Sequence, residues 1–365
     1  MSEMTPLEAE IRRLIAIAGP MPLAQYMTLC LTHPTHGYYM TRDPLGVSGD
    51  FTTAPEVSQM FGELVGLWAA AAWRQMGAPE NIRLVEMGPG RGTMMLDAIR
   101  AAGVEPAFRS AIVVHLVEIS PTLQQRQRQT LTGVDVPILW HQSLDEVPDG
   151  PIIILANEFF DTLPIHQVMK QPNGWHERVI GIREGKLAFG LAPTPIPQFD
   201  SLLPRKVREA PVGSIYEWRS DHVAIDLGRR VLHSHGAALI IDYGHTESQI
   251  GDTLQAVSKH GFADPFDTPG QIDLTAHVDF QALGDAAESF GASVQGPVEQ
   301  GEFLRRLGIE TRARALKALV TPEKASEIDA GVDRLVGTGA TGMGSLFKTI
   351  GICDPALGKL AGFET

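Results

Sequence analysis

The sequence has few cysteines and no long hydrophobic run. Cys30 and Cys353 are the only two among 365 residues, and neither has His or Cys neighbours at ligand spacing, so neither a disulfide framework nor a zinc site is indicated. No apolar stretch approaches the ~20 residues that a membrane-spanning helix needs. The opening MSEMTPLEAEIRRL lacks the apolar and small-residue regions of a secretory signal, and its acidic residues disfavour a transit peptide. These absences predict a cytoplasmic protein without a metal site or membrane insertion.

Positive charge is also scarce. Lys and Arg total 30 against 43 Asp and Glu, giving a formal net charge of −13, which argues against nucleic acid as a partner and favours a cationic one. Hydrophobic residues make up 44% and charged residues 20%, so wholesale disorder is excluded. The length allows one large domain or two ordinary ones.

Short apolar runs alternate with helical stretches from residue 82 onward. Strands separated by helices pair in parallel through right-handed crossovers, and strands without polar alternation are buried on both faces. The pattern therefore predicts an α/β fold built on a doubly wound sheet. The runs are IRLVEMG, AIVVHLVEI, VPILW, PIIILANEF and ALIIDYG, with a last candidate in SLFKTIGIC.

The spacing of these runs also predicts insertions. More than seventy residues separate the runs at Ile152 and Leu239, which is too many for a simple crossover. In the first part of this segment, apolar and polar residues alternate between turn signals, as in an antiparallel meander. We expect an N-terminal helical segment with a lid loop, a core, an inserted β-rich cap and a helical insertion. The N-terminal segment spans 1–81, and the core spans 82–165, 237–300 and 344–355. The cap spans 166–236 and the helical insertion 301–343.

Periodicity and capping signals locate several helices, including the following three. Thr5 can cap a helix that opens at Pro6. A strongly periodic helix opens at Pro55 and ends at Gly77. A third runs from about residue 275 to about residue 290.

A glycine-rich turn, VEMGPGRGT, follows the first of the parallel strands. Gly88, Gly90 and Gly92 permit unusual backbone angles and close approach of a ligand, and the helix that follows offers unpaired amide donors. The turn predicts nucleotide binding, with a tight strand-to-helix turn that binds nothing as the alternative.

Three residues near the turn discriminate between cofactors. Glu86 lies inside the strand, where a carboxylate is costly unless a cation or hydrogen-bond donor meets it. It would repel a dinucleotide pyrophosphate, whereas S-adenosylmethionine (SAM) carries an ammonium and a sulfonium. Pro89 removes an amide that a pyrophosphate could use, and Glu118, after the next strand, is placed to accept both ribose hydroxyls. SAM is the expected cofactor, with a nicotinamide dinucleotide as the distant alternative.

Further polar residues follow the next two strands. Ser143 and Leu144 stand where the adenine edge is expected, and Trp140 could stack on adenine or belong to the core. Asn157, Glu158 and Asp161 follow the strand at the carboxyl edge where doubly wound folds bind ligands, and they are expected to face the methyl group.

Several longer blocks resemble one family. In chain order they are GDFTTAPEVSQMFGE, VEMGPGRGTMM, LVEISPTL, ANEFFDTLP, WHERVIG, IDYG and PGQIDLTAHVDF. Together they resemble the MidA-like SAM-dependent methyltransferases, and the match covers most of the chain, in order.

This resemblance implies a class I methyltransferase core, which is a Rossmann-like, seven-stranded sheet ending in a reversed β-hairpin, with substrate-cap elements added. Mitochondrial members of the family are protein arginine methyltransferases that act on a subunit of respiratory complex I during its assembly. The chain resembles the bacterial form. A protein substrate, including a respiratory complex subunit, is therefore an expectation that rests on the resemblance.

An arginine acceptor would give the carboxylates of ANEFFDTLP a defined task. A planar guanidinium is held best by bidentate acid partners, so Glu158 is the first candidate for the catalytic acid and Asp161 the second, with a turn-forming role as the alternative for Asp161. Phe160 is expected to line the substrate channel or to pack in the core. Asp50, Phe51 and Thr53 are expected to contact substrate from the lid loop. A small-molecule methyltransferase and a non-catalytic SAM-binding assembly factor remain as alternative functions.

Overall fold

The computed structural model describes residues 4–42, 53–258, 261–339 and 342–364. The chain forms two compact units, and each is assembled from three stretches of sequence. The first unit contains residues 1–44, 161–220 and 247–279. The second contains residues 45–160, 221–246 and 280–365.

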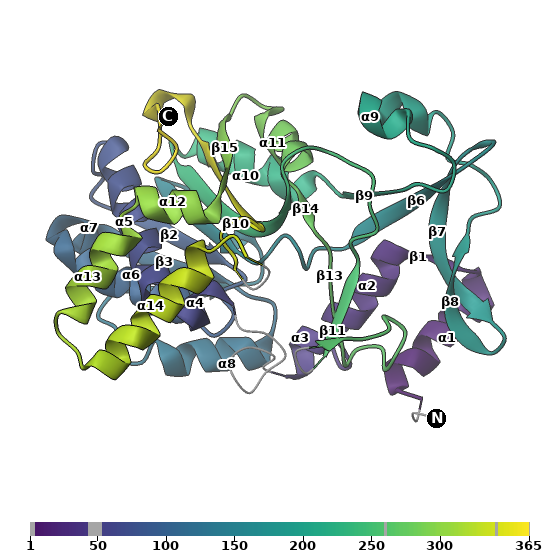
Figure 1. The fold of residues 1–365 in the computed structure, drawn as a ribbon, viewed down its shortest axis with the longest axis horizontal. Coiled ribbons are helices and arrows are strands. Elements are labelled where there is room, and N and C mark those ends of the chain that lie inside the picture. Colours follow the sequence, from purple (N-terminus) through teal and green to yellow (C-terminus); the bar gives the residue numbers. More distant parts are fainter. Residues whose placement is uncertain (1–3, 43–52, 259–260, 340–341, 365) are drawn as a thin grey trace. The chain divides into compact units, whose positions relative to one another are not determined.

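A seven-stranded path of hydrogen-bonded strands forms the centre of the second unit (Figure 1), in the order β15-β16-β10-β5-β2-β3-β4. Neighbours from β10 to β4 pair in parallel, whereas β16 is antiparallel to both β10 and β15. This arrangement confirms the expected doubly wound sheet with a reversed hairpin at one edge. Its strands are β2 (Ile82–Met87), β3 (Ile112–Val117), β4 (Ile138–His141), β5 (Ile152–Asn157), β10 (Ala237–His245), β15 (Ser293–Glu299) and β16 (Phe347–Cys353).

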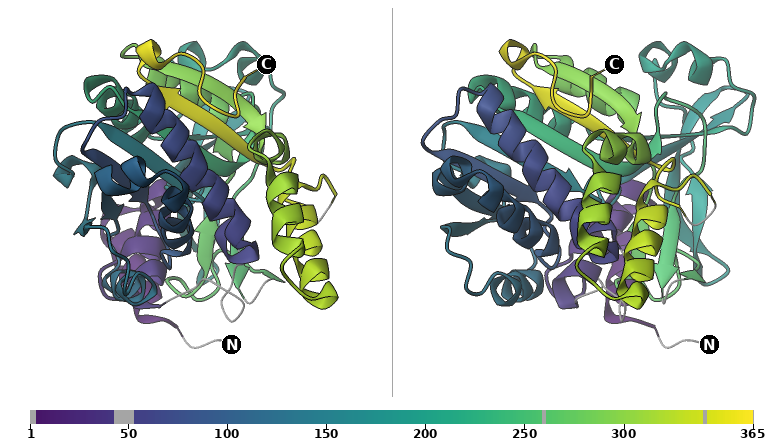
Figure 2. Two further views of the ribbon diagram at one scale, coloured as in Figure 1. Left: turned by 90° about the vertical axis from the view of Figure 1, so that its left-hand side faces the viewer. Right: turned by 60° about the vertical axis from the view of Figure 1, so that its left-hand side comes forward.

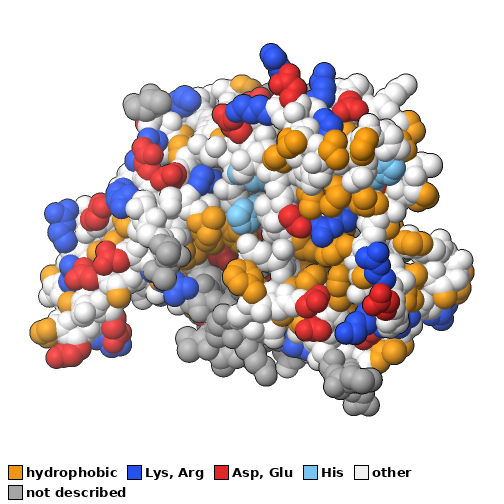
Figure 3. Space-filling view, turned by 45° about the vertical axis from the view of Figure 1, so that its right-hand side comes forward, with side chains coloured by type: hydrophobic (Ala, Val, Ile, Leu, Met, Phe, Trp, Pro, Cys, Tyr) orange, Lys and Arg blue, Asp and Glu red, His pale blue; other side chains and the backbone are white. Residues whose placement is uncertain are grey.

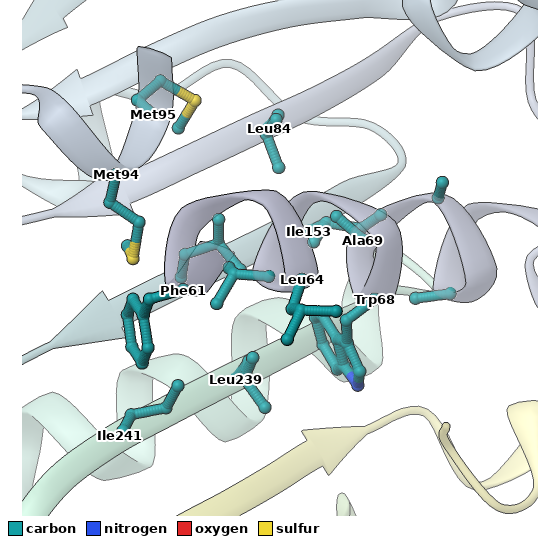
Figure 4. Close-up of a cluster of buried hydrophobic side chains, with 14 of the residues drawn as sticks. Phe61, Leu64, Trp68, Ala69, Leu84, Met94, Met95, Ile153, Leu239 and Ile241 are labelled. Atoms are coloured by element: carbon teal, nitrogen blue, oxygen red, sulfur yellow. The ribbon is translucent and has the colours of Figure 1, made fainter. Parts of the chain in front are cut away.

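Helix α5 (Gln59–Gln75) covers one face of this sheet. Figure 4 shows its Phe61, Leu64 and Trp68 directed toward the strand residues Leu239 and Ile241, all within one buried cluster. Helix α6 (Thr93–Ala101) crosses α5 closely, because a Cβ placed on Gly66 would lie only 2.6 Å from the backbone of Ala98. Glycine is therefore required at this crossing.

Other helices cover the opposite face. Side chains alternate along a strand, so Ile350 faces away from Phe347, which belongs to the α5 cluster. Ile350 lies 3.5 Å from the position of a Cβ on Gly284 in α11 (Phe280–Glu288), and α11 packs on α10 (His222–His233). On the α5 side, Figure 2 shows α13 (Ile309–Lys317) and α14 (Pro322–Val336) side by side, and both contribute residues to the α5 cluster. The unit also contains α7 (Pro106–Ala111), α8 (Pro121–Thr130) and α12 (Gln300–Arg306).

Two of the predicted helices differ in the structure. The helix expected from Pro55 to Gly77 is broken at Ser58, whose backbone is extended, into α4 (Ala54–Val57) and α5. The break is stabilised because the Ser58 hydroxyl accepts a hydrogen bond from the Met60 amide and caps α5. The helix expected from about residue 275 begins only at Phe280, because β13 (Asp273–Thr275) and β14 (Val278–Asp279) occupy the preceding residues.

The first unit has an antiparallel sheet. Its strands lie in the order β1-β7-β6-β9, with β8 paired to β7, which confirms the predicted meander. Helix α1 (Pro6–Ala18) is capped by Thr5 as predicted and packs with α2 (Leu23–Thr32) in a buried cluster. The strands are β1 (Met21–Pro22), β6 (Ile165–Gln171), β7 (Gly174–Arg183), β8 (Lys186–Leu191) and β9 (Ile215–Arg219), and the short elements are α3 (Tyr38–Thr41), α9 (Arg205–Arg208), β11 (Gln255–Ser258) and β12 (Gly261–Phe262).

The unit boundaries differ from the four parts expected from the sequence. Residues 53–81 lie with the seven-stranded sheet because the apolar face of α5 is buried on its strands. Helix α10, expected in the cap, also lies in the second unit. Within the described part of the chain, no helix is both long enough and apolar enough to span a bilayer.

Candidate active site

The glycine-rich turn joins β2 to α6 as predicted. Gly88, Gly90 and Gly92 all have positive φ angles, at 61°, 53° and 81°, where a side chain would be strained. A Cβ on Gly88 would also lie 2.9 Å from the Phe159 ring. The turn is fixed internally by the Gly92 amide, which donates to the Pro89 carbonyl at 2.7 Å. The peptide units here are thus open to close approach by a ligand.

Glu86 presents a buried and unsatisfied carboxylate beside this turn. The residue is 3% exposed, and its Oε2 has no hydrogen-bond partner among the described residues. Burial, with a smaller contribution from the Glu118 charge, raises the pKa of Glu86 to about 8. A cation that entered here would satisfy the orphaned oxygen and ionise the acid, so the site fits an ammonium group.

Glu118 is the second buried acid, one residue beyond β3. Its Oε1 accepts from the Ser120 amide at 2.8 Å and its Oε2 accepts from the Gln127 side chain at 3.1 Å. Burial raises its pKa to about 7, although these hydrogen bonds oppose the shift. Each oxygen retains acceptor capacity for a ligand hydroxyl.

Two residues near the turn, Gln127 and Glu56, were not identified from the sequence. Gln127 in α8 is fully buried and bonds both Glu118 and the Gly90 carbonyl, but a glutamine in a polar helix gives no sequence signal. Glu56 in α4 accepts from the Thr93 hydroxyl at 2.7 Å, at the first residue of α6. Trp140 donates to Gln127, and Arg128 lies 3.8 Å from the centroid of its ring, so an arginine already covers the indole.

The adenine-side predictions lie beyond β4. Ser143 is exposed and Leu144 half-buried, and the Ser143 carbonyl accepts from the Glu146 amide at the start of a short 3-10 turn. Their assignment to the cofactor stays a prediction.

The acids after β5 are held in different ways. Glu158 has a positive φ of 49°, which is strained for a residue with a side chain, and its amide donates to the Ile241 carbonyl at 3.0 Å. Its Oε1 accepts from the Ala54 amide and from the Asn157 side chain, both at 3.2 Å. The Oδ1 atom of Asn157 is buried with no hydrogen-bond partner among the described residues. These two side chains therefore present fixed polar atoms at the carboxyl edge of the sheet.

The next residues belong to both units. Phe160, in the second unit, is buried with its ring edge-to-face on Phe159, and its amide donates to Asp242 at 2.9 Å. Asp161 belongs to the first unit, where its carbonyl accepts from the Ala276 amide at 3.0 Å and from Arg219 at 3.2 Å. The roles of Phe160 and Asp161 in substrate binding and catalysis stay predictions.

The predicted lid residues are only partly described. Asp50 and Phe51 lie outside the described residues, whereas Thr53 directly precedes α4 in an extended conformation. Among the described residues, no cluster of three or more His, Cys, Asp or Glu side chains could hold a metal ion.

The sheet order, the glycine turn and the two buried acids define a nucleotide-binding α/β enzyme. A family model described as "Putative S-adenosyl-L-methionine-dependent methyltransferase" matches residues 64–298, and the chain belongs to this family. It is therefore a SAM-dependent methyltransferase of the class I fold, as the sequence predicted.

Individual relatives are similar over most of their length. The "Protein arginine methyltransferase NDUFAF7 homolog, mitochondrial" of Drosophila melanogaster is 38% identical and covers 94% of this chain and 83% of its own. The "Protein arginine methyltransferase NDUFAF7, mitochondrial" of Homo sapiens is 37% identical, with 86% and 76% covered. A crystal structure of a COG1565 superfamily member from Burkholderia thailandensis, bound to S-adenosyl-homocysteine, has a TM-score of 0.84 at 29% identity and covers 98% of this chain and 94% of its own.

The residues of this site fit SAM. The orphaned Oε2 of Glu86 suits the amino group of the methionine part, and Glu118 suits the ribose hydroxyls. Gly88 is exposed and Gly90 half-buried, so the backbone of the turn is accessible to a ligand. Both acids become better hydrogen-bond acceptors when ionised, and a cationic ligand favours their ionised form.

Proposed function

We propose that the chain transfers a methyl group from SAM to the guanidinium of an arginine in a protein partner. The observation that carries the proposal is the carboxylate of Glu158, fixed by Ala54 and Asn157 at the carboxyl edge of the sheet. The ring of Phe159, the next residue, lies 2.9 Å from the position of a Cβ on Gly88, so Glu158 adjoins a residue that packs on the glycine turn. The names of the relatives support a protein arginine as the acceptor.

The proposed roles of the residues follow from their chemistry. When bound, SAM supplies a methyl group on a sulfonium, and the rest of the molecule is the leaving group, a neutral thioether. Glu158 would bind the planar guanidinium, direct one nitrogen at the methyl group and keep the positive charge on the other two. As the nitrogen–carbon bond forms, that nitrogen loses one proton, which Glu158 accepts and passes to solvent. Asp161 is the second proposed acid, and Asn157 is proposed to contact the cofactor.

The surface is consistent with local rather than broad recognition of a cation. Figure 3 shows one face of the molecule, on which acidic, basic and hydrophobic side chains are interspersed and no single sign of charge dominates. On this face, a positively charged partner would thus be selected by individual acids and not by an extended field.

The test is label transfer from methyl-tritiated SAM to proteins of a cell extract, followed by acid hydrolysis and chromatographic identification of the labelled amino acid. Label in methylarginine supports the proposal. Label in a low-mass fraction would identify a small-molecule methyltransferase, and absence of label with retained SAM binding would identify a non-catalytic assembly factor.

The finer proposal is that the partner is a subunit of a respiratory complex and that the reaction takes place in the cytoplasm. The choice of partner rests on the family resemblance, whereas the cytoplasm is expected from the scarcity of cysteine and of long apolar runs. Peptide mass spectrometry of the labelled band would identify the partner, and cell fractionation would locate the enzyme. A labelled protein unrelated to respiration would contradict it.

A further inference from the structure

The amide of Gln127 connects three parts of the cofactor site. The residue is completely buried in α8. Its Nε2 donates to the Gly90 carbonyl at 2.9 Å and to Glu118 Oε2 at 3.1 Å, while its Oε1 accepts from the Trp140 indole at 3.0 Å. Both amide donors are thereby used, one on the glycine turn and one on the acid proposed to bind ribose.

These bonds restrict how Glu118 can be oriented. The Ser120 amide holds one carboxylate oxygen and Gln127 holds the other, so the carboxylate plane cannot rotate without breaking a hydrogen bond. Such bonds to a charged group in a buried site are worth more than neutral ones. Arg128 stacks on Trp140 and so supports the indole that orients the Gln127 amide.

We infer that Gln127 is a positioning residue for the cofactor, which fixes the Glu118 carboxylate for the ribose diol and locks the ribose site to the glycine turn. This inference rests on the SAM site used by the proposed function, but it does not depend on the identity of the methyl acceptor. If Gln127 served only to fill the core, its replacement would alter folding stability and would not discriminate between ligands that differ at the ribose.

A ribose-specific binding experiment separates these two roles. Gln127→Met keeps the side-chain length and removes all three polar contacts. The matched control is Gln124→Met, since Gln124 lies on the same helix and donates to the backbone carbonyl of Glu118 at 2.7 Å, not to its carboxylate. The probes are S-adenosylhomocysteine and its 2′-deoxy analogue, and affinities are measured by calorimetry.

We expect Gln127→Met to lower the affinity for S-adenosylhomocysteine about tenfold, as the loss of a hydrogen bond to a charged group would. The affinity for the deoxy analogue should fall much less. Gln124→Met should leave the ratio of the two affinities at the parent value. Equal weakening of both ligands by Gln127→Met, or the same ratio change in Gln124→Met, would overturn the inference. Because neither ligand needs an acceptor, failure to find methylarginine leaves this test intact.

The pH dependence of binding gives a second readout. The Gln127 hydrogen bond opposes the rise in the pKa of Glu118, so its loss should move the pH midpoint of S-adenosylhomocysteine affinity upward. Glu86 is the acid whose charge couples to Glu118, and it titrates in parent and variant alike, so the midpoints are compared between the two. An unchanged midpoint would contradict the inference.

A conservative variant covers the case in which Gln127→Met fails to fold. In Gln127→Glu, a protonated carboxyl can still donate to Glu118, whereas two ionised acids repel. Affinity should approach the parent value at low pH and fall as the pH rises, opposite to the parent. Parent-like pH dependence in this variant would refute a positioning role.

Discussion

Glu158 combines a strained backbone with a fixed carboxylate, and its charge is the feature that the proposed chemistry uses. We expect Glu158→Gln to lower kcat by about 10²- to 10⁴-fold, because the amide neither accepts a proton nor holds a guanidinium by charge. Binding of SAM should be unchanged, since the acid is proposed to face the acceptor. Steady-state kinetics and calorimetry test both parts.

The control for this variant is Glu184→Gln, at an exposed turn between β7 and β8, which should keep parent kinetics. A Glu158→Gln enzyme with full kcat would remove Glu158 from the mechanism and transfer attention to Asp161.

Glu86 should make the stability of the ligand-free protein depend on pH. Its pKa is about 8 in the folded chain against an ordinary 4.5, so between these values the folded state holds a proton that the unfolded state has lost. Stability contributed by this group therefore falls as pH rises through that interval. In thermal unfolding, the melting temperature of Glu86→Gln should rise relative to that of the parent as the pH is raised from about 5 to about 8.

The ligand should reverse the sign of this effect, because an ammonium favours the ionised acid and S-adenosylhomocysteine would then bind the parent more tightly at higher pH. A constant difference in melting temperature between Glu86→Gln and the parent across this pH range would show that Glu86 is not buried as described.

At the scale of elements, the α5–α6 crossing depends on the absence of a side chain. Gly66→Ala would bring a Cβ to 2.6 Å from Ala98, so we expect a loss of about 1–3 kcal/mol in the free energy of unfolding despite the better helix propensity of alanine. The matched control is Gly331→Ala within α14, where the nearest atom is 3.5 Å away.

The control should be stabilised by about 0.5–1 kcal/mol, because it gains helix propensity without a clash. Denaturant unfolding of both variants measures the difference in sign. A neutral Gly66→Ala variant would mean that the two helices separate easily.

At the scale of the whole molecule, all described residues proposed to bind the cofactor belong to the second unit. S-adenosylhomocysteine at about 100 times its Kd should stabilise the folded state by about 2.7 kcal/mol. Hydrogen exchange should report the protection in peptides that cover residues 86–92 and 118–127. Comparable protection in the meander, residues 165–191, would contradict a cofactor site built from the second unit.

The sequence predicted those features of the whole chain that depend on local chemistry. Apolar runs without polar alternation revealed the sheet, and Glu86 and the glycines revealed the turn, because burial and backbone freedom are visible in residue type. Gln127 was missed since its role arises only when α8 brings it to Glu118 and Gly90. The helix break at Ser58 was missed because the hydrophobic periodicity continues through it.

Strand order has a consequence for biosynthesis. Strand β16 lies between β10 and β15 in the described sheet and pairs with both. It consists of residues 347–353, far along the chain from β10. Because a chain is synthesised from its N-terminus, β10, which ends at residue 245, is made long before β16. The edge of β10 that pairs with β16 therefore lacks this partner while residues 246–346 are made, so a nascent chain stalled before residue 347 is the form on which chaperones would be most needed.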